Sequence, residues 1–398
     1  MNVRQYQQSM IKIVRKQMKC FCLLLALFMF LAGQQKVYAA EDLTPNAASS
    51  ILIEVNGGKV IYGKQEHERL YPASMTKMMG MLLIMEAINQ GKLTWDTIVT
   101  VSEHAASMGG SQIYLKPLEQ MRVDDLFKSV AIASANDAIV ALGEKIASSE
   151  ENFVQMMNDR AKKIGLSNTH FTNASGLHDP EHYSTAYDMA MIGRELVRVG
   201  GDALLKYTST YDAYVREDTD NKFWLVNTNK LVRFYEGTDG LKTGFTQDSK
   251  YCITVTTKRG GLRLIAVVMK EPTSAIRNKE VTKLMDYGFG LYDTLPLYVK
   301  DQVIQQMQVE NGKPKMVDVK IKDEIREIIQ KGQGNSLAKS EVILSKTTAP
   351  LVSGEVVGKI KVQMVDGIVV ESDLIVGEDV IPLTYFDVLK NTMNRFWF

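Results

Sequence analysis

The sequence has very little cysteine and histidine. Only three of its 398 residues are cysteine and five are histidine. Cys20 and Cys22 lie in an apolar run near the N-terminus that has the features of a cleaved leader, so Cys252 alone would remain in the mature chain. A single cysteine cannot form an intrachain disulfide, and the apolar residues around Cys252 indicate a buried, inert thiol.

Several motifs of hydrolytic enzymes are also missing. The sequence contains neither H-E-x-x-H nor G-x-S-x-G, which argues against a zincin and against an α/β-hydrolase triad. The run His178-Asp179-Pro180-Glu181-His182 matches the H-x-x-E-H pattern of inverted zinc peptidases, which needs both histidines on one helix face. Because Pro180 disfavours a helix there, we interpret the run as a loop and expect no metal and no cofactor.

Neither sign of charge is in large excess, since 47 Lys and Arg balance 46 Asp and Glu. Residues 1–39 hold six of the cations and no acid, and their apolar stretch from Cys20 to Ala32 is followed by small residues up to Ala39. This pattern predicts a secretory signal peptide; the alternative, an uncleaved anchor, has a short apolar stretch for a spanning helix. The mature net charge is then −5, from +1 minus 6, and nothing indicates nucleic-acid binding.

Hydrophobic periodicity divides the rest of the chain into two regions with different sequence patterns. Before about residue 293, apolar runs of helical length alternate with short β-like runs, beginning with a hairpin pattern around Asn56-Gly57-Gly58. We expect helices at 75–88, 123–146, 152–164, 185–199 and 275–289, and strands at 50–55, 59–62, 241–245, 251–257 and 262–269. After about Pro296 short alternating strands dominate, which predicts a small all-β domain.

The most informative stretch is Ser74-Met75-Thr76-Lys77, at the start of an apolar run that reaches Ile88. A helix that is apolar on almost all sides is buried, and residues i and i+3 share one face. Burial lowers the pKa of a lysine, and a neutral lysine can accept the proton of a serine nucleophile. Taken alone, however, S-x-x-K also fits an N-cap serine followed by a solvated lysine.

Two further polar clusters interrupt apolar surroundings. Ser134-Ala135-Asn136 places a hydroxyl and a carboxamide in a run that otherwise resembles core, where a helix kink or N-cap is the alternative. Lys242-Thr243-Gly244, at the predicted start of a strand, offers a cation, a hydroxyl and a glycine that a substrate backbone can approach; an exposed strand entry is the alternative. S-x-x-K, S-x-N about 57 residues later and K-T-G about 106 residues after that form the motif set of active-site serine β-lactamases and penicillin-binding proteins.

The chain resembles the low-molecular-mass penicillin-binding proteins, the D-alanyl-D-alanine carboxypeptidases of peptidase family S11. The blocks YPASMTKMM, SANDA, FTNASGLHDPEHYSTAYDMA and GLKTGFT carry the resemblance, which runs from about Pro45 to about Val376. The block LVSGEVVGKIKV is similar to the second-domain β module of the family. Within the family the sequence looks most similar to the sporulation-type carboxypeptidases of Gram-positive bacteria.

The resemblance implies an α/β (α+β) serine β-lactamase/transpeptidase-like domain, with an antiparallel sheet flanked by helices, followed by a small all-β domain. The expected divisions are a signal peptide at 1–39, the catalytic domain at 40–293, a β-sandwich-like domain at 294–380 and an amphipathic anchor helix at 381–398. The anchor would attach the secreted enzyme to the outer face of the cytoplasmic membrane; the alternative is a helix packed on the β domain. Its expected partners are peptidoglycan stem peptides and β-lactam antibiotics.

The resemblance also implies a role for each motif residue. Ser74 would attack the carbonyl between two D-alanines, Lys77 would be its general base, and Ser134 would relay a proton to the leaving amine. The remaining residues would bind substrate. Asn136 would hold its amide and also orient Lys77, and Lys242 and Thr243 would bind its terminal carboxylate. Gly244 would give access, and Phe245 would join Ser74 in the oxyanion hole through backbone N–H groups.

Two other functions share the motif set. A class A β-lactamase carries a downstream E-x-x-L-N loop, but in the nearest match, Glu217 to Asn221, Asp220 stands where leucine belongs and the match comes late in the chain. A non-catalytic penicillin sensor would keep the fold, but the intact Ser134, Asn136 and Lys242 argue against lost chemistry.

Overall fold

The computed structural model describes residues 18, 42–332, 339–363, 367, 369–387 and 389. The expected cleavage site and most of the expected C-terminal helix lie outside these residues. Among the residues described, none of the helices combines the length and the apolar character that a membrane span requires. The helical elements are η1 (Ala73–Thr76), α2 (Lys77–Asn89), α3 (Glu103–Ala106), α4 (Val123–Ala133), α5 (Asn136–Ala147), α6 (Glu150–Lys163), α7 (Ala186–Thr208), α8 (Leu231–Phe234) and α9 (Ser274–Leu291).

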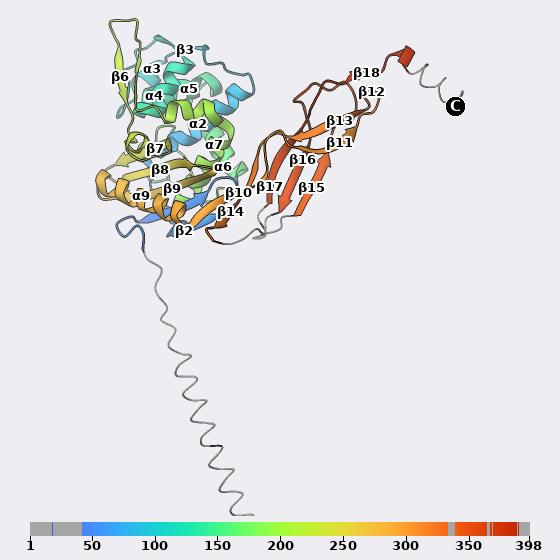
Figure 1. Cartoon of the computed structure of the whole chain (residues 1–398). Helices are drawn as coiled ribbons and strands as arrows, with labels where there is room; N and C mark the ends of the chain where they lie inside the picture. The colour runs from blue at the N-terminus through green and yellow to red at the C-terminus, as the bar shows by residue number, and fades with distance from the viewer. Residues whose placement is uncertain are drawn as a thin grey trace, which may run out of the picture. The chain divides into compact units, whose positions relative to one another are not determined.

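The first sheet is antiparallel and has the order β2-β1-β9-β8-β7 (Figure 1). Its strands are β1 (Ser49–Glu54), β2 (Val60–Lys64), β7 (Thr238–Thr246), β8 (Lys250–Arg259) and β9 (Leu262–Glu271). These confirm the predicted hairpin and the three predicted strands. Strand β7 begins three residues earlier than expected, so K-T-G lies in the middle of an edge strand and not at its start.

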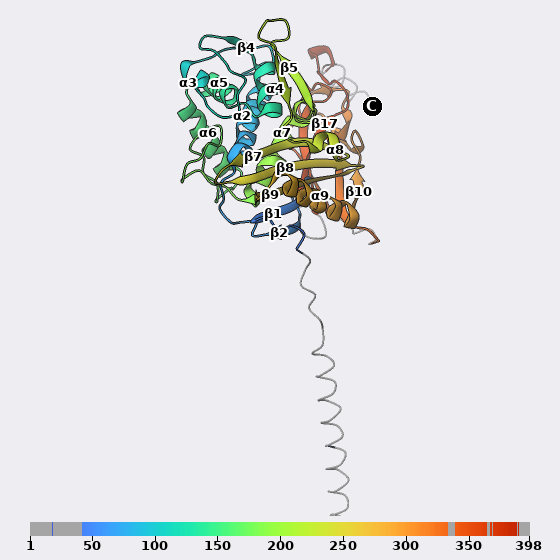
Figure 2. The same ribbon diagram turned by 90° about the vertical axis from the view of Figure 1, so that its left-hand side faces the viewer.

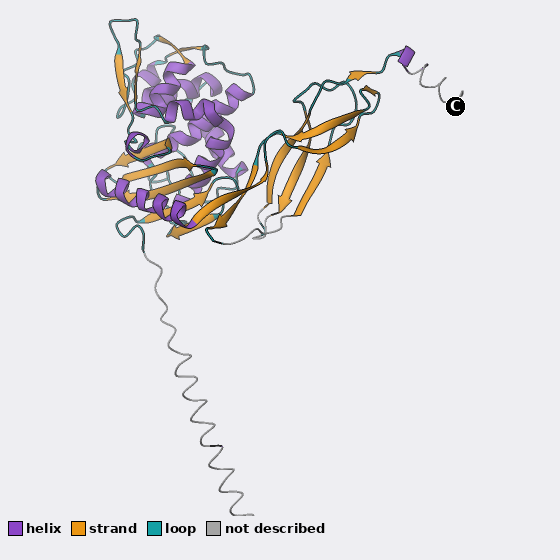
Figure 3. Cartoon of the chain, viewed as in Figure 1, coloured by secondary structure: helices purple, strands orange, loops and turns teal. Residues whose placement is uncertain are grey.

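Alternating side chains of the sheet face two separate cores. On β9, Ile265 and Val267 pack with α2 and α7, whereas Leu264 and Ala266 pack with α9. This period of two is the pattern of a sheet covered on both faces. Figures 2 and 3 show the resulting layers, with α9 on one side and the larger helical group on the other. The antiparallel sheet flanked by helices is therefore confirmed.

Two short two-stranded ribbons accompany the helices. They are β3 (Ile98–Thr100) with β4 (Gln120–Arg122), and β5 (Asp212–Val215) with β6 (Phe223–Val226). Neither ribbon was predicted, because strands of three or four residues give little periodic signal. The turn of the β5–β6 hairpin contacts a segment that precedes β4, since Arg216 Nη1 donates to the Ile113 carbonyl at 2.9 Å.

The C-terminal region contains a second antiparallel sheet in the order β11-β13-β17-β16-β15. Its strands are β11 (Val303–Gln308), β13 (Met316–Ile321), β15 (Lys339–Leu344), β16 (Val356–Gln363) and β17 (Val369–Val376), around a core of their own. Smaller pairs are β10 (Tyr292–Tyr298) with β14 (Ile325–Gln330), and β12 (Gly312–Lys313) with β18 (Ile381–Pro382). The all-β second part is confirmed, and the expected boundary at 293 and 294 falls inside β10.

Candidate active site

The S-x-x-K motif folds as a short 3₁₀ turn that leads directly into the central helix. Ser74 lies in η1 and Lys77 is the first residue of α2. Lys77 is completely buried, and its Nζ lies 2.9 Å from Ser74 Oγ and donates to the Ser175 carbonyl at 2.6 Å. The predicted pairing of hydroxyl and amine at the start of a buried helix is therefore present.

The environment of Lys77 favours the neutral amine. Burial holds the pKa of Lys77 well below its usual range; the nearby positive charge of Lys242 lowers it further, and Asp137 partly opposes this shift. Desolvation disfavours the charged form of a buried lysine that has no ion-pair partner. A neutral Lys77 has a lone pair that can accept the Ser74 proton.

A break between two helices presents the S-x-N motif. Helix α4 ends at Ala133 and is capped by Ser134, whose φ of 64° lies in the left-handed region; α5 begins at Asn136. Ser134 Oγ and Asn136 Oδ1 are buried and lack a hydrogen-bond partner within the described residues. Buried polar atoms are almost always paired, so these two atoms are suited to bind a ligand. The break confirms the predicted interruption of the 123–146 run.

Strand β7 contributes a buried cation to the site. Lys242 is almost fully buried, and no carboxylate forms an ion pair with it in the described part of the chain. Burial lowers the pKa of Lys242 to about 7, and the charge of Arg277 acts in the same direction. An anionic ligand would therefore be the missing partner of this lysine. Beside it, the Thr243 hydroxyl donates to Thr228 Oγ1 at 2.8 Å.

Two glycines allow other segments to approach the backbone that carries Ser74. A Cβ atom added at Gly244 would lie 2.5 Å from the Pro72 carbonyl oxygen. At Gly176, where φ is +82°, the added atom would lie 1.9 Å from the Ala73 carbonyl oxygen. Any side chain there would push β7 or the 173–177 loop away from η1. The next residue on β7, Phe245, is half exposed, and its ring lies 4.4 Å from that of Tyr251.

The sequence did not indicate the parts played by Ser175 and His182. His182 is buried; its Nδ1 accepts from the Thr172 N–H at 3.1 Å, so Nε2 carries the proton toward Thr76 Oγ1 at 2.7 Å. Burial lowers the pKa of His182 to about 4, so the ring is neutral at pH 7. The histidine thus ties the loop that supplies the Ser175 carbonyl to the turn that supplies Ser74.

The alternative motifs lie elsewhere. Residues 217–221, the nearest match to a class A β-lactamase loop, belong to the turn between β5 and β6. His178 lies 3.5 Å from Asp248, whereas His182 points to Thr76. The described residues contain no group of three or more His, Cys, Asp or Glu side chains that could hold a metal ion.

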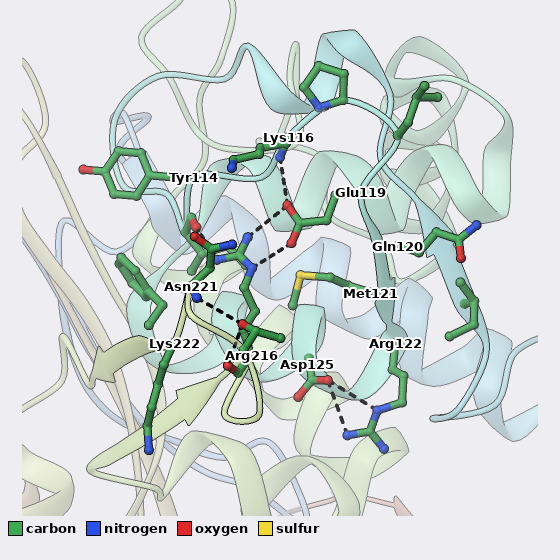
Figure 4. Close-up of a pocket in the computed structure, with 16 residues that line it drawn as sticks. Tyr114, Lys116, Glu119, Gln120, Met121, Arg122, Asp125, Arg216, Asn221 and Lys222 are labelled. Atoms are coloured by element: carbon green, nitrogen blue, oxygen red, sulfur yellow. Dashed lines mark hydrogen bonds and ion pairs between the residues drawn. The ribbon is translucent and has the colours of Figure 1, made fainter.

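A separate cavity of about 730 Å³ lies between the chain around β4 and the β5–β6 turn (Figure 4). Tyr114, Glu119, Arg216 and Phe223 are among its lining residues, and none of the predicted site residues lines it. Its size alone therefore does not identify the reactive centre, which is defined by the Ser74–Lys77 pair.

Family comparisons agree with this geometry. Residues 35–273 match the peptidase S11 model, described as D-alanyl-D-alanine carboxypeptidase. The chain belongs to this family. Residues 292–381 match the C-terminal domain of penicillin-binding protein 5. The predicted family and enzyme class are thus confirmed.

Relatives from several bacteria match most of this S11 family member. The D-alanyl-D-alanine carboxypeptidase DacF of Bacillus subtilis is 45% identical over 89% of this chain and 91% of the relative. DacC of Escherichia coli is 34% identical over 89% of this chain and 90% of the relative. The crystal structure of penicillin-binding protein 5 from Haemophilus influenzae aligns with a TM-score of 0.65 at 32% identity, covering 86% of this chain and 99% of that one. Penicillin-binding protein D2 of Listeria monocytogenes, solved with ampicillin bound, aligns with a TM-score of 0.56 at 31% identity. The alignment covers 63% of this chain and 100% of that one.

Proposed function

We propose that this D-alanyl-D-alanine carboxypeptidase removes the terminal D-alanine of peptidoglycan stem peptides through an acyl-enzyme on Ser74. The observation that carries the proposal is the fully buried Lys77, whose Nζ lies 2.9 Å from Ser74 Oγ. Because burial lowers the pKa of Lys77, the lysine accepts the serine proton as Ser74 attacks the carbonyl carbon.

Ser134 and Asn136 complete the acylation step. The unpartnered Ser134 hydroxyl would pass a proton from Lys77 to the departing D-alanine amine. The unpartnered Asn136 Oδ1 would accept an N–H of the substrate, because Nδ2 already donates to the Gly109 carbonyl. Neither hydrogen bond of Lys77 Nζ involves Asn136, so we assign Asn136 to substrate binding and not to orienting the base.

Strand β7 would bind the end of the substrate. Lys242 supplies the cation that a terminal carboxylate needs, and Thr243 supplies a hydroxyl beside it. Gly244 lets the strand pass close to η1, so that the backbone N–H groups of Ser74 and Phe245 can bind the developing oxyanion. Water would then attack the acyl-enzyme, with Lys77 and Ser134 serving both half-reactions.

The experiment that tests this assignment is D-alanine release from diacetyl-Lys-D-Ala-D-Ala. Lys77→Arg keeps the positive charge but cannot deprotonate at working pH, so turnover and penicillin acylation should fall by about 10³-fold or more. The folded state of the variant is checked by its thermal unfolding. Near-normal acylation by K77R, or penicillin label recovered on a residue other than Ser74, would contradict the assignment.

A β-lactam should acylate Ser74 quickly, and the resulting acyl-enzyme should be hydrolysed slowly. Its leaving group stays tethered after ring opening, and the described residues place no glutamate of a class A loop beside the site. We propose that the covalent adduct lasts minutes or longer. Penicillin labelling and a chase would measure its lifetime. Loss of the label within seconds at neutral pH would favour a β-lactamase instead.

We also propose that the mature enzyme begins near residue 40 and acts outside the cytoplasm, at the membrane surface. The described start of the C-terminal segment has strongly exposed aromatic side chains, Tyr385 and Phe386, which suits burial in a membrane interface. Liposome flotation of the mature protein with and without residues 382–398 tests the attachment. Equal flotation of the two forms would reject it.

A further inference from the structure

One buried carboxylate next to the S-x-N motif is assigned neither to substrate binding nor to proton transfer. Asp137 follows Asn136 directly, is fully buried, and accepts four hydrogen bonds from three backbone N–H groups. Two of these groups, Ile113 at 3.1 and 3.2 Å and Leu115 at 3.0 Å, belong to the same distant loop. A buried carboxylate is tolerated only where such donors replace water, so this arrangement fixes the loop strongly.

The same loop is attached to Asn136 on its other side. The Asn136 backbone N–H donates to the Ser111 carbonyl at 2.7 Å, and Asn136 Nδ2 donates to the Gly109 carbonyl at 2.6 Å. Gly110, with φ +82°, lies so close that an added Cβ would be 2.8 Å from Asn136 Nδ2. Residues 109–115 thus determine which way the Asn136 carboxamide is turned, and so where its unpartnered Oδ1 points.

Arg216, in the β5–β6 turn, holds this loop from outside. Its Nη1 donates to the carbonyl of Ile113 at 2.9 Å, the residue whose N–H is bound by Asp137. Its Nε and Nη2 bind Glu119 at 2.7 and 3.2 Å, as Figure 4 shows. Arg216 has φ of 55°, and Tyr114 in the loop and Leu118 just after it also have positive φ. Strain of this kind persists only where the surrounding contacts enforce it.

We propose that Asp137 and Arg216 are positioning residues that clamp Ile113 from its two sides and thereby orient Asn136 toward the substrate amide. This inference rests on the proposed role of Asn136. Asp137 does not contact substrate; it acts through residues 109–115. Removing its negative charge should favour the neutral form of Lys77, because Asp137 raises the pKa of that lysine. The electrostatic effect of Asp137→Asn on Lys77 should therefore help the base to accept a proton. A loss of activity in this variant would have to come from another cause, such as the position of Asn136.

The test compares two substrates in D137N. One is the acylated D-Ala-D-Ala peptide, and the other is its depsipeptide analogue, in which an ester replaces the amide before the penultimate D-alanine, whose N–H we assign to Asn136 Oδ1. The bond that Ser74 attacks is then the same in both substrates. The wild-type enzyme should prefer the amide by about two- to tenfold in kcat/KM, the value of one net hydrogen bond. In D137N the ratio of kcat/KM for the amide to kcat/KM for the ester should fall toward one. A variant that is merely less folded loses rate equally on both substrates, and its active fraction is counted by penicillin titration.

Two further variants make the result decisive. Asn136→Ala should abolish the preference; if it does not, the proposed role of Asn136 fails, which is a different outcome from failure of the clamp. Glu54→Gln is the matched control, since Glu54 is also a buried carboxylate that binds two backbone N–H groups, at 2.6 and 2.7 Å, but in the β1–β2 turn. E54Q should lose stability and keep the wild-type preference.

Arg216→Gln keeps the proposal testable if D137N does not fold, because Arg216 binds the loop from a surface turn. R216Q should reduce the preference in the same direction as D137N. A folded D137N or R216Q that keeps the full wild-type preference, while N136A loses it, would overturn the clamp.

Discussion

The close approach of β7 to the Ser74 turn gives a sharp prediction for Gly244→Ala. The added methyl carbon would lie 2.5 Å from the Pro72 carbonyl oxygen, and 3.2 and 3.4 Å from Ala73 Cβ and Met75 Cγ. Ordinary contacts begin near 3.4 Å, so the strand and the turn must separate by about 0.9 Å, which is 3.4 minus 2.5. The first contact is with backbone, which cannot rotate away as a flexible side chain can.

This separation should cost activity more than stability. A displacement of about 1 Å between reacting groups costs on the order of 10²-fold in rate, and overpacking a core costs about 1–3 kcal/mol. We therefore expect G244A to remain folded while its rate of penicillin acylation and its kcat/KM for D-alanine release fall about 10²-fold. Fluorescent penicillin labelling, peptide turnover and thermal unfolding measure the three quantities.

Gly290→Ala is the control, because Gly290 is exposed in α9 and an added Cβ meets no atom within 4 Å. G290A should keep full activity and gain up to about 1 kcal/mol of helix stability. The reasoning would be refuted by a folded G244A that reacts with penicillin within about threefold of the wild-type rate.

Three other outcomes follow from the buried Lys242 and the buried His182. Lys242→Ala should cripple turnover of peptides with a free C-terminus and affect a C-terminally amidated peptide much less; equal losses on both would mean that Lys242 does not act by binding the carboxylate. Because the pKa of Lys242 is about 7 without ligand, KM for the free-acid peptide should rise as pH increases through 7, and a flat KM across pH 6 to 8 would disprove this. His182 has a pKa of about 4 in the fold against an ordinary value of 6.5, so the stability from its neutral form is complete above pH 6.5 and is lost as pH falls toward 4, by up to about 3 kcal/mol. Urea unfolding at pH 7.5 and 4.5 should show a smaller pH dependence in His182→Gln than in wild type.

Local patterns predicted much of the fold and most of the candidate site. The apolar run after Ser74 gave a buried helix because its side chains leave no polar face, and Asn56-Gly57-Gly58 gave the hairpin because such residues favour tight turns. The polar residues at 134–137 marked a real break between α4 and α5. Short strands such as β5 and β6 were missed, since their pairing, and not their own periodicity, defines them.

Local sequence patterns identify the chemical groups that the enzyme possesses: a serine three residues before a lysine at the start of a buried helix, a hydroxyl and a carboxamide in a helix break, and a lysine on a strand. Which distant atoms meet these groups depends on the tertiary structure. The Ser175 carbonyl reaches Lys77 across 98 positions, and Gly176 and Gly244 fit against the turn before Lys77 from separate segments. Likewise Asp137 and Arg216 meet at Ile113. Such contacts depend on the packing of segments far apart in the chain, and local residue preferences carry no information about that packing.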